Sequence, residues 1–108
     1  MTHPSKVKGN VFEREVVQAF RDRADWSAER AYASNGKALG KDETVDVLVV
    51  HADSGIELSI QCKRRKAVAS WLECNMHQDA IVFRADNKQS YIAMPLSVFL
   101  DLIDRVRQ

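Results

Sequence analysis

The spacing of apolar residues predicts a helix near each end of the chain. Apolar side chains recur at helical intervals from Phe12 to Phe20, which predicts a helix over residues 11–23 with Asn10 as its N-cap. A second helical stripe follows Pro95, a residue suited to the first turn of a helix, and predicts a final helix. Helices therefore open and close the predicted fold.

The middle of the chain has the alternating pattern of β-strands. Residues 45–50 form a mostly apolar run, and residues 56–62 alternate strictly between apolar and polar side chains. A short polar turn centred between Asp53 and Ser54 separates the two runs. The pattern therefore predicts a β-hairpin over residues 45–62.

Turn length sets the register of a hairpin. The expected turn places Asp46 opposite Gln61, and Lys63 is the next residue on the same face of the strand. The open end of the hairpin then gathers a carboxylate, an amide and an ammonium, which together can hold a divalent metal and a phosphate. The alternative is an ordinary amphipathic hairpin with a charged outer face.

Shorter apolar segments lie between turn signals elsewhere in the chain. In order, they predict a core side chain at Trp26, a short strand at 30–33, a helix at about 69–77, and strands at 80–84 and 90–94. The sequence of elements predicts an α/β fold in which helices flank a mixed β-sheet. A chain of 108 residues suits one domain, with residues 1–9 as a flexible basic arm.

Charge and cysteine content exclude some classes of function for this chain. The net charge of +1 does not by itself indicate a nucleic-acid partner, but residues 63–66 are four consecutive cations. Cys62, Cys74 and His77 lack the fourth ligand of a zinc site, and two cysteines give no disulfide framework. No signal or membrane-spanning segment is visible, which predicts a cytoplasmic protein without a membrane partner. The glycines of residues 36–41 lack nucleotide-loop spacing, so no nucleotide cofactor is expected.

Four segments together carry a family resemblance that covers almost the whole chain. They are KGNVFEREV at 8–16, SNG at 34–36, VDVLVV at 45–50 and QCKRR at 61–65. In this order they resemble the PD-(D/E)xK nuclease superfamily, and within it the archaeal-type Holliday junction resolvases, including those carried by phages. The resemblance implies a restriction-endonuclease-like fold in the order α-β-β-β-α-β-β-α. It also implies a metal-dependent endodeoxyribonuclease with functions in DNA recombination and repair.

The resemblance implies catalytic roles for Glu13, Asp46, Gln61 and Lys63. Asp46 matches the metal-binding aspartate, Lys63 the motif lysine, and Glu13 a helical glutamate that faces the metal. Gln61 departs from the family pattern because most members carry Asp or Glu there. The proline that usually precedes the aspartate is also replaced, by Val45, which affects only the backbone.

The implied metal is Mg²⁺, for which Mn²⁺ can substitute. Its expected ligands are Asp46, the Gln61 side-chain oxygen and the Cys62 backbone carbonyl, with Glu13 as a further ligand through water. An amide oxygen can coordinate Mg²⁺, but it leaves the site with one fewer negative charge. Glu13 also follows Asn10 at capping-box spacing, so a purely structural role stays open.

The expected DNA contacts are cations and one loop serine: Lys6, Lys8, Arg30, Ser34, Lys37, Arg64, Arg65 and Lys66. The resemblance implies a homodimer that cuts four-way junctions, in the host cytoplasm if the chain is phage-encoded. Two alternatives stay open. The first is a restriction or repair endonuclease of the same superfamily that acts on duplex DNA. The second is a catalytically silent DNA-binding module, which Gln61 would permit.

Overall fold

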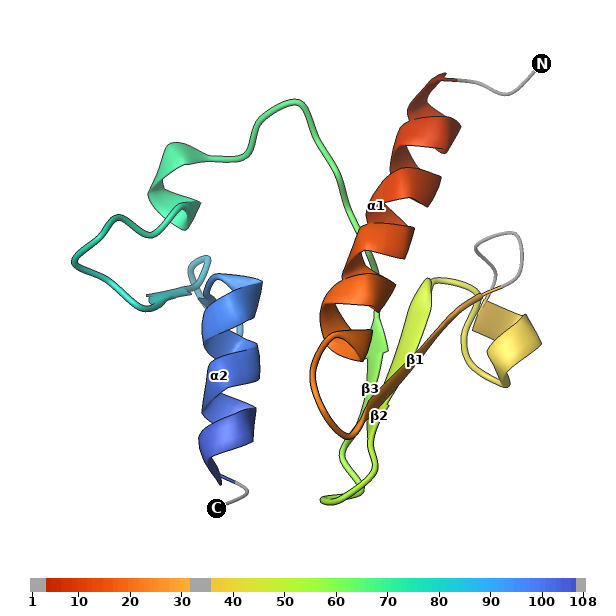
Figure 1. Cartoon of the computed structure of the whole chain (residues 1–108). Helices are drawn as coiled ribbons and strands as arrows, with labels where there is room; N and C mark the ends of the chain where they lie inside the picture. The colour runs from red at the N-terminus through yellow and green to blue at the C-terminus, as the bar shows by residue number, and fades with distance from the viewer. Residues whose placement is uncertain (1–3, 32–35, 107–108) are drawn as a thin grey trace. The chain divides into compact units, whose positions relative to one another are not determined.

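A computed structural model describes residues 4–31 and 36–106 of the chain (Figure 1). The chain divides into two compact units, Met1–Arg64 and Arg65–Gln108. The first unit contains α1 (Pro4–Arg21), β1 (Trp26–Arg30), the 3-10 helix η2 (Gly36–Leu39), β2 (Val47–His51) and β3 (Glu57–Ile60). The second contains the 3-10 helix η3 (Ser70–Leu72), β4 (Ile81–Phe83), β5 (Tyr91–Ala93) and α2 (Leu96–Val106). A single nuclease domain stays a prediction.

Helix α1 begins earlier than the sequence pattern predicts. It starts at Pro4, so residues 4–9 are helical and do not form an irregular arm. Proline is tolerated in a first helical turn, and Gly9 weakens a helix by only about 1 kcal/mol relative to alanine. Asn10 therefore lies inside the helix, and its predicted role as the N-cap is wrong.

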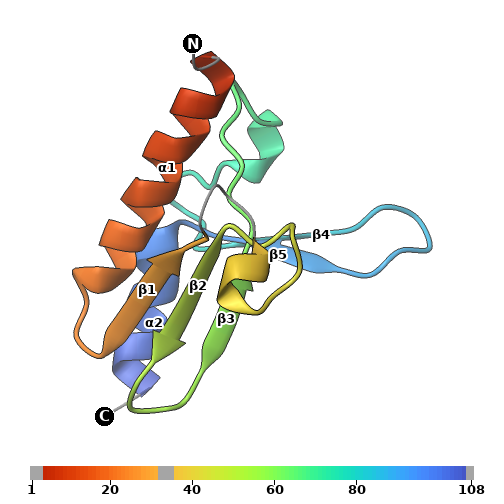
Figure 2. The same cartoon turned by 90° about the vertical axis from the view of Figure 1, so that its right-hand side faces the viewer.

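The first unit is built on a three-stranded antiparallel sheet in the order β1-β2-β3 (Figure 2). Helix α1 packs against β1 and β2. The buried apolar side chains between them are Val16, Val17, Phe20, Trp26, Ala28, Val47 and Val49. The rings of Phe20 and Trp26 meet edge-on with centroids 5.0 Å apart, a favourable aromatic geometry. This core confirms Trp26 as a buried side chain.

Strand β1 lies earlier in the chain than the predicted strand at 30–33. Trp26 and Ala28 are buried, whereas Ser27 and Glu29 are exposed, which is the alternation of a half-buried edge strand. The guanidinium of Arg21 donates to the Ala28 carbonyl at 3.1 and 2.7 Å. These hydrogen bonds fasten the end of α1 to the strand that follows it.

The hairpin of β2 and β3 has the predicted register. Val47 lies opposite Ile60, and Val50 lies opposite Glu57. At the turn, the His51 N–H donates to the Ile56 carbonyl at 2.8 Å. Gly55 adopts φ +76°, a left-handed conformation that glycine reaches without a steric penalty. The register follows from this turn and from the alternation of side chains.

The second unit departs from prediction in its first half. The predicted helix at 69–77 is only the 3-10 turn η3, Ser70–Leu72. Downstream, the Asn75 side chain accepts a hydrogen bond from the His77 N–H at 2.8 Å, and the Asn75 carbonyl accepts from the Gln78 N–H at 3.1 Å. Such local hydrogen bonds by asparagine compete with helix formation. The segment therefore turns instead of continuing as a helix.

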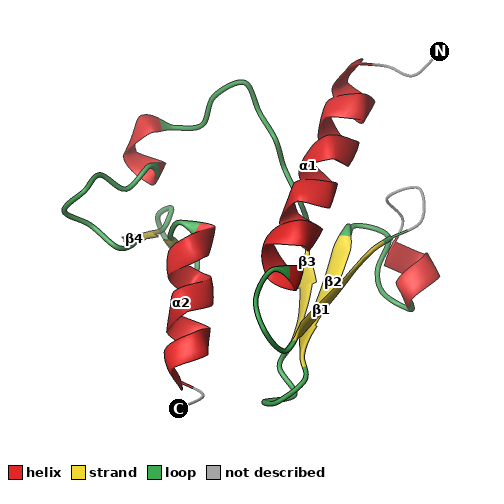
Figure 3. Cartoon of the chain, viewed as in Figure 1, coloured by secondary structure: helices red, strands yellow, loops and turns green. Residues whose placement is uncertain are grey.

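The second half of this unit follows the prediction (Figure 3). Strands β4 and β5 pair antiparallel, and α2 follows Pro95, whose carbonyl accepts from the N–H groups of Val98 and Phe99. The α/β fold class with a helix at each end is confirmed. All described strands pair antiparallel in two separate sheets, so the described residues do not form the predicted single mixed sheet.

Candidate active site

Asp46 occupies a firmly held position at the start of the central strand. Its N–H donates to the Ile60 carbonyl at 2.9 Å, and its carbonyl accepts from the Ala31 N–H at 2.8 Å. Because β2 is the central strand, these two hydrogen bonds tie the backbone of Asp46 to the chain beside β1 and to the chain beside β3. The position of the Asp46 Cα atom, from which the side chain extends, is therefore fixed.

The Asp46 carboxylate is tied to the chain that leaves β3. Its Oδ2 atom accepts a hydrogen bond of 2.7 Å from the Cys62 N–H. Hydrogen bonds to a charged acceptor are among the stronger ones in proteins. The peptide between Gln61 and Cys62 is thereby held beside the carboxylate.

Asp46 directly precedes β2, and Gln61 directly follows β3. The paired residues of the hairpin end with Val47 opposite Ile60, so the predicted pairing of Asp46 with Gln61 lies one residue beyond the paired strands. The side chains of Gln61 and Lys63 are exposed. Their catalytic roles stay predictions.

Glu13 is buried on α1 at 6% relative exposure, with a cationic partner that the sequence did not reveal. The Nε and Nη2 atoms of Arg30 both lie 3.3 Å from its Oε1 atom, and Nη2 also donates to the Asn10 Oδ1 at 3.3 Å. The spacing of Asn10 and Glu13 thus reflects a shared ion-pair network and not a capping box. A buried carboxylate needs such a partner.

The negative charges of two carboxylates affect the pKa of the Cys62 thiol. Burial first, and then the carboxylates of Asp46 and Glu13, raise its pKa from 9.0 to about 11 against the opposing effect of Arg30. The thiol is therefore protonated at neutral pH and suits neither nucleophilic attack nor metal ligation.

The predicted DNA-contacting residues differ in their exposure and in their ion-pair partners, and one of them lies outside the described residues. Arg64, Arg65 and Lys66 are exposed, in a segment without regular secondary structure. Lys37 lies 3.7 Å from Glu43, and both side chains are mostly exposed, so this pair contributes little to stability. Lys6 and Lys8 lie in the helical backbone of α1, Ser34 lies outside the described residues, and Arg30 is engaged with Glu13.

Lys41 is a further cation that sequence reasoning missed. Its Nζ atom lies 2.7 Å from the Glu57 carboxylate. Glu57 is the first residue of β3, and Gln61 follows the last residue of the same strand. Only the folded chain brings Lys41 to β3, since its partner is far away in the sequence.

The donor atoms at the end of the hairpin fit Mg²⁺ in type. The Asp46 carboxylate, the Gln61 amide and the Cys62 carbonyl all offer oxygen, which hard cations prefer. Within the described ranges, no three His, Cys, Asp or Glu side chains form a metal-binding group. The donor set therefore resembles neither a zinc site nor a site rich in carboxylates.

No helix of the described residues is long and apolar enough to cross a membrane.

Comparison with known protein families gives a match over nearly the whole chain. The family model described as "Phage putative PDDEXK endonuclease" matches residues 4–107, a range that includes the whole hairpin and parts of both compact units. Searches of curated proteins and of solved structures found no match. The long match and the α/β order of elements support a restriction-endonuclease-like fold. The chain therefore belongs to this phage family of PD-(D/E)xK endonucleases.

Proposed function

We propose that the protein is a metal-dependent endonuclease that hydrolyses phosphodiesters in branched DNA, as Holliday junction resolvases do. One observation carries the proposal: the 2.7 Å hydrogen bond from the Cys62 N–H to the Asp46 carboxylate, at the end of a hairpin whose register closes with Val47 opposite Ile60. Membership of an endonuclease family supports DNA as the substrate. The branched substrate rests on the resemblance of the sequence motifs to resolvases.

In the proposed mechanism, Asp46 provides the charged ligand, and Gln61 and the Cys62 carbonyl provide neutral oxygen ligands. When bound there, Mg²⁺ or Mn²⁺ supplies Lewis acidity at the phosphate and acidifies a water molecule. The Cys62 N–H keeps the Asp46 carboxylate oriented through the reaction. Lys63 orients the attacking water and stabilises the negative charge that develops on the phosphate, as a compact ammonium can.

The carboxylates of Glu13 and Asp46 both raise the pKa of the Cys62 thiol, and Arg30 opposes them. The ion pair at 3.3 Å keeps the Glu13 carboxylate in one orientation. Because its carboxylate is paired with Arg30, Glu13 would help to hold a metal only through a water molecule. Asn10 supports the arrangement by accepting a hydrogen bond from Arg30.

A junction-cutting enzyme makes paired cuts, so we propose a homodimer with two active sites. The apolar side chains of Leu102 and Val106 are exposed about one helical turn apart on α2, and they would form part of the proposed subunit contact. The exposed cations Arg64, Arg65 and Lys66 would contact phosphates without reading sequence.

The deciding experiment compares a four-way junction with a linear duplex built from the same arms, in the presence of Mg²⁺ and of a chelator. Symmetric, Mg²⁺-dependent nicks in the junction alone support the resolvase. Equal cutting of both substrates indicates an endonuclease for duplex DNA instead. DNA binding without cleavage under any metal condition indicates the silent module that Gln61 permits.

A further inference from the structure

Three aromatic rings gather in the second unit, on elements that are apart in the sequence. The rings of Trp71 and Phe83 meet edge-on with centroids 5.2 Å apart, and those of Phe83 and Tyr91 are stacked at 5.8 Å. Phe83 and Tyr91 are cross-strand partners on β4 and β5, so their side chains share one face of the hairpin.

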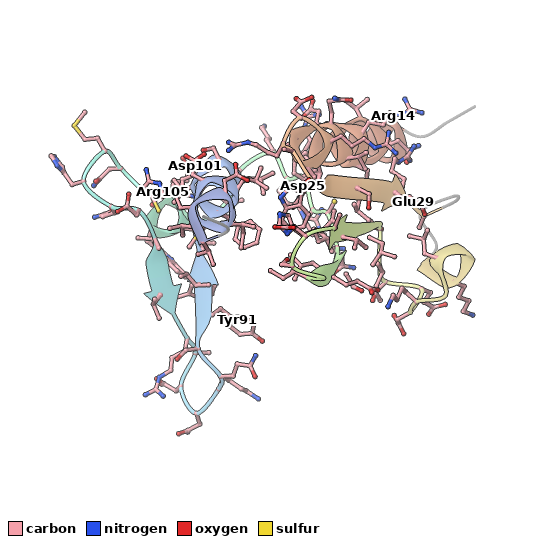
Figure 4. All side chains as sticks on the ribbon, turned by 60° about the horizontal axis from the view of Figure 1, so that its bottom comes forward. Arg14, Asp25, Glu29, Tyr91, Asp101 and Arg105 are labelled. Atoms are coloured by element: carbon pink, nitrogen blue, oxygen red, sulfur yellow. The ribbon has the colours of Figure 1, made fainter. Side chains whose placement is uncertain are left out.

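The outer two rings remain open to solvent. Trp71 is 57% exposed and Tyr91 is 56% exposed, whereas Phe83 is half-buried between them. Figure 4 shows Tyr91 projecting sideways from β5. Aromatic side chains of this size usually bury most of their surface, because burial is their main contribution to stability. The exposed rings of Trp71 and Tyr91, on either side of Phe83, indicate a surface on which a planar partner could stack.

A hollow of about 440 Å³ lies beside these rings. Its lining consists of aromatic and cationic side chains with one alanine: Trp71, Phe83, Arg84, Ala85, Lys88 and Tyr91. The volume lies within the usual range for small-ligand pockets. Since the lining contains two cations and no acid, it favours an anionic partner.

A second hollow in the same unit has a different lining and serves as a comparison. Asp79, Asp101 and Arg105 contribute to it, so acids outnumber cations there. Figure 4 shows Asp101 and Arg105 on α2. The hollow beside Trp71 and Tyr91 therefore differs from this one, because exposed rings and cations line it without an acid.

Flat rings next to cations are the features with which proteins hold single-stranded nucleic acid. Bases stack on aromatic side chains, and Lys or Arg side chains contact the phosphates. In a duplex the bases are stacked on one another, so their faces are unavailable to the protein. A partner that uses both the rings and the cations is therefore an unpaired nucleotide.

We propose that this hollow binds an unpaired nucleotide of a DNA strand. The base stacks on Trp71 or Tyr91, and the flanking phosphates contact Arg84 and Lys88. The proposal rests on the proposed nuclease function and deepens it, because it specifies DNA with unpaired bases, such as bases at a branch point, as the substrate.

The test measures binding of a labelled short oligothymidylate by fluorescence anisotropy, with chelator present so that no cleavage occurs. Trp71→Leu and Tyr91→Leu should each weaken binding by about tenfold, because each removes a stacking surface. Trp71→Phe and Tyr91→Phe keep a ring and should retain most of the affinity. In the wild type, oligothymidylate should quench tryptophan fluorescence through Trp71, since Trp26 is buried.

Charge is tested with a matched pair of exposed cations. Lys88→Gln should weaken binding and lower the salt dependence by roughly one unit of log-log slope, whereas Arg105→Gln, in the comparison hollow, should change neither. Circular dichroism and thermal melting confirm that each variant folds. The proposal is overturned if folded Trp71→Leu binds as wild type does, or if Arg105→Gln weakens binding as much as Lys88→Gln. It is also overturned if the leucine variants change the oligomeric state and leave oligothymidylate affinity unchanged.

The nuclease proposal and the nucleotide-hollow proposal can be disproved independently of each other. If wild-type protein cuts junctions with Mg²⁺ but does not bind oligothymidylate, the nucleotide hollow is wrong and the nuclease stands. If it binds oligothymidylate through Trp71 but cuts no DNA with any metal, the hollow stands and the nuclease proposal fails.

Discussion

The Oδ2 atom of Asp46 accepts a hydrogen bond of 2.7 Å from the backbone N–H of Cys62, which joins the start of β2 to the chain that leaves β3. The carboxylate thus has a structural role in addition to its proposed role as a metal ligand. Two substitutions at this position separate the two roles.

Asp46→Asn keeps a side-chain oxygen that can accept the hydrogen bond from Cys62 but removes the charge. We expect a folded protein that loses metal-dependent cleavage. Asp46→Ala also leaves the Cys62 N–H without its acceptor and should lower the free energy of unfolding by roughly 1–3 kcal/mol. Urea unfolding and a junction-cleavage assay measure the two effects. If Asp46→Asn cleaves DNA as wild type does, Asp46 is not the metal ligand.

Lys63→Ala should abolish cleavage and leave DNA affinity nearly unchanged. The reason is that a catalytic ammonium acts mainly on the charge that develops in the transition state. Cleavage rates and DNA affinity are measured on the same preparation. Arg105→Ala removes another exposed cation and provides the control. Mg²⁺-dependent cleavage that survives in Lys63→Ala would exclude Lys63 from the chemistry.

Gln61→Glu should strengthen metal binding, because a second carboxylate joins Asp46 at the end of the hairpin. Calorimetric titration with Mn²⁺ and with Mg²⁺ measures the change in affinity. Gln89→Glu adds the same charge at an exposed position in the other compact unit and should have no effect. Equal affinities for wild type and folded Gln61→Glu would argue against the proposed ligands.

Glu13→Gln should destabilise the first unit, since it leaves the Arg30 guanidinium without its charged partner. The loss should be about 1–3 kcal/mol, less than for a fully buried pair because Arg30 is partly exposed. Glu15→Gln, at an exposed position on the same helix, is the control and should cost little. Urea unfolding of both variants tests the difference, which should be absent if the ion pair is only a surface contact.

The Cys62 thiol should react slowly with alkylating reagents at neutral pH. Its pKa is raised from 9.0 to about 11, first by burial and then by the nearby carboxylates. In a Cys74→Ser background, the alkylation rate should rise with a midpoint near the raised pKa, and urea should return the midpoint to the ordinary range. A folded-state midpoint near 9.0 would contradict the assigned environment.

The same shift predicts how Cys62 affects stability. Because its pKa is higher in the folded state, the folded protein holds the proton more tightly than the unfolded chain does. The contribution of this thiol to stability is complete below about pH 9.0 and declines as the pH rises towards 11. Urea unfolding across this range should show the decline, and Cys62→Ser should remove it.

The sequence alone determined the hairpin and its register. The polar turn and the strict alternation from residue 56 onward predict a register in which Val47 lies opposite Ile60, and the structure has that register from Val47 to Val50. The final helix after Pro95 was predicted for the same kind of reason, because both signals come from residues that are close together in the chain.

Only the tertiary structure decided which distant side chains meet. Arg30 joins Glu13 across the contact between α1 and β1, and Trp71 joins Phe83 and Tyr91 across a long segment. The segment predicted as a helix at 69–77 forms only the short 3-10 helix η3, because Asn75 makes local hydrogen bonds that compete with a helix. A pattern of apolar residues does not reveal such hydrogen bonds. Periodicity reports which face of an element is apolar, but ion pairs and ring clusters depend on how elements pack, so they become visible only in the folded chain.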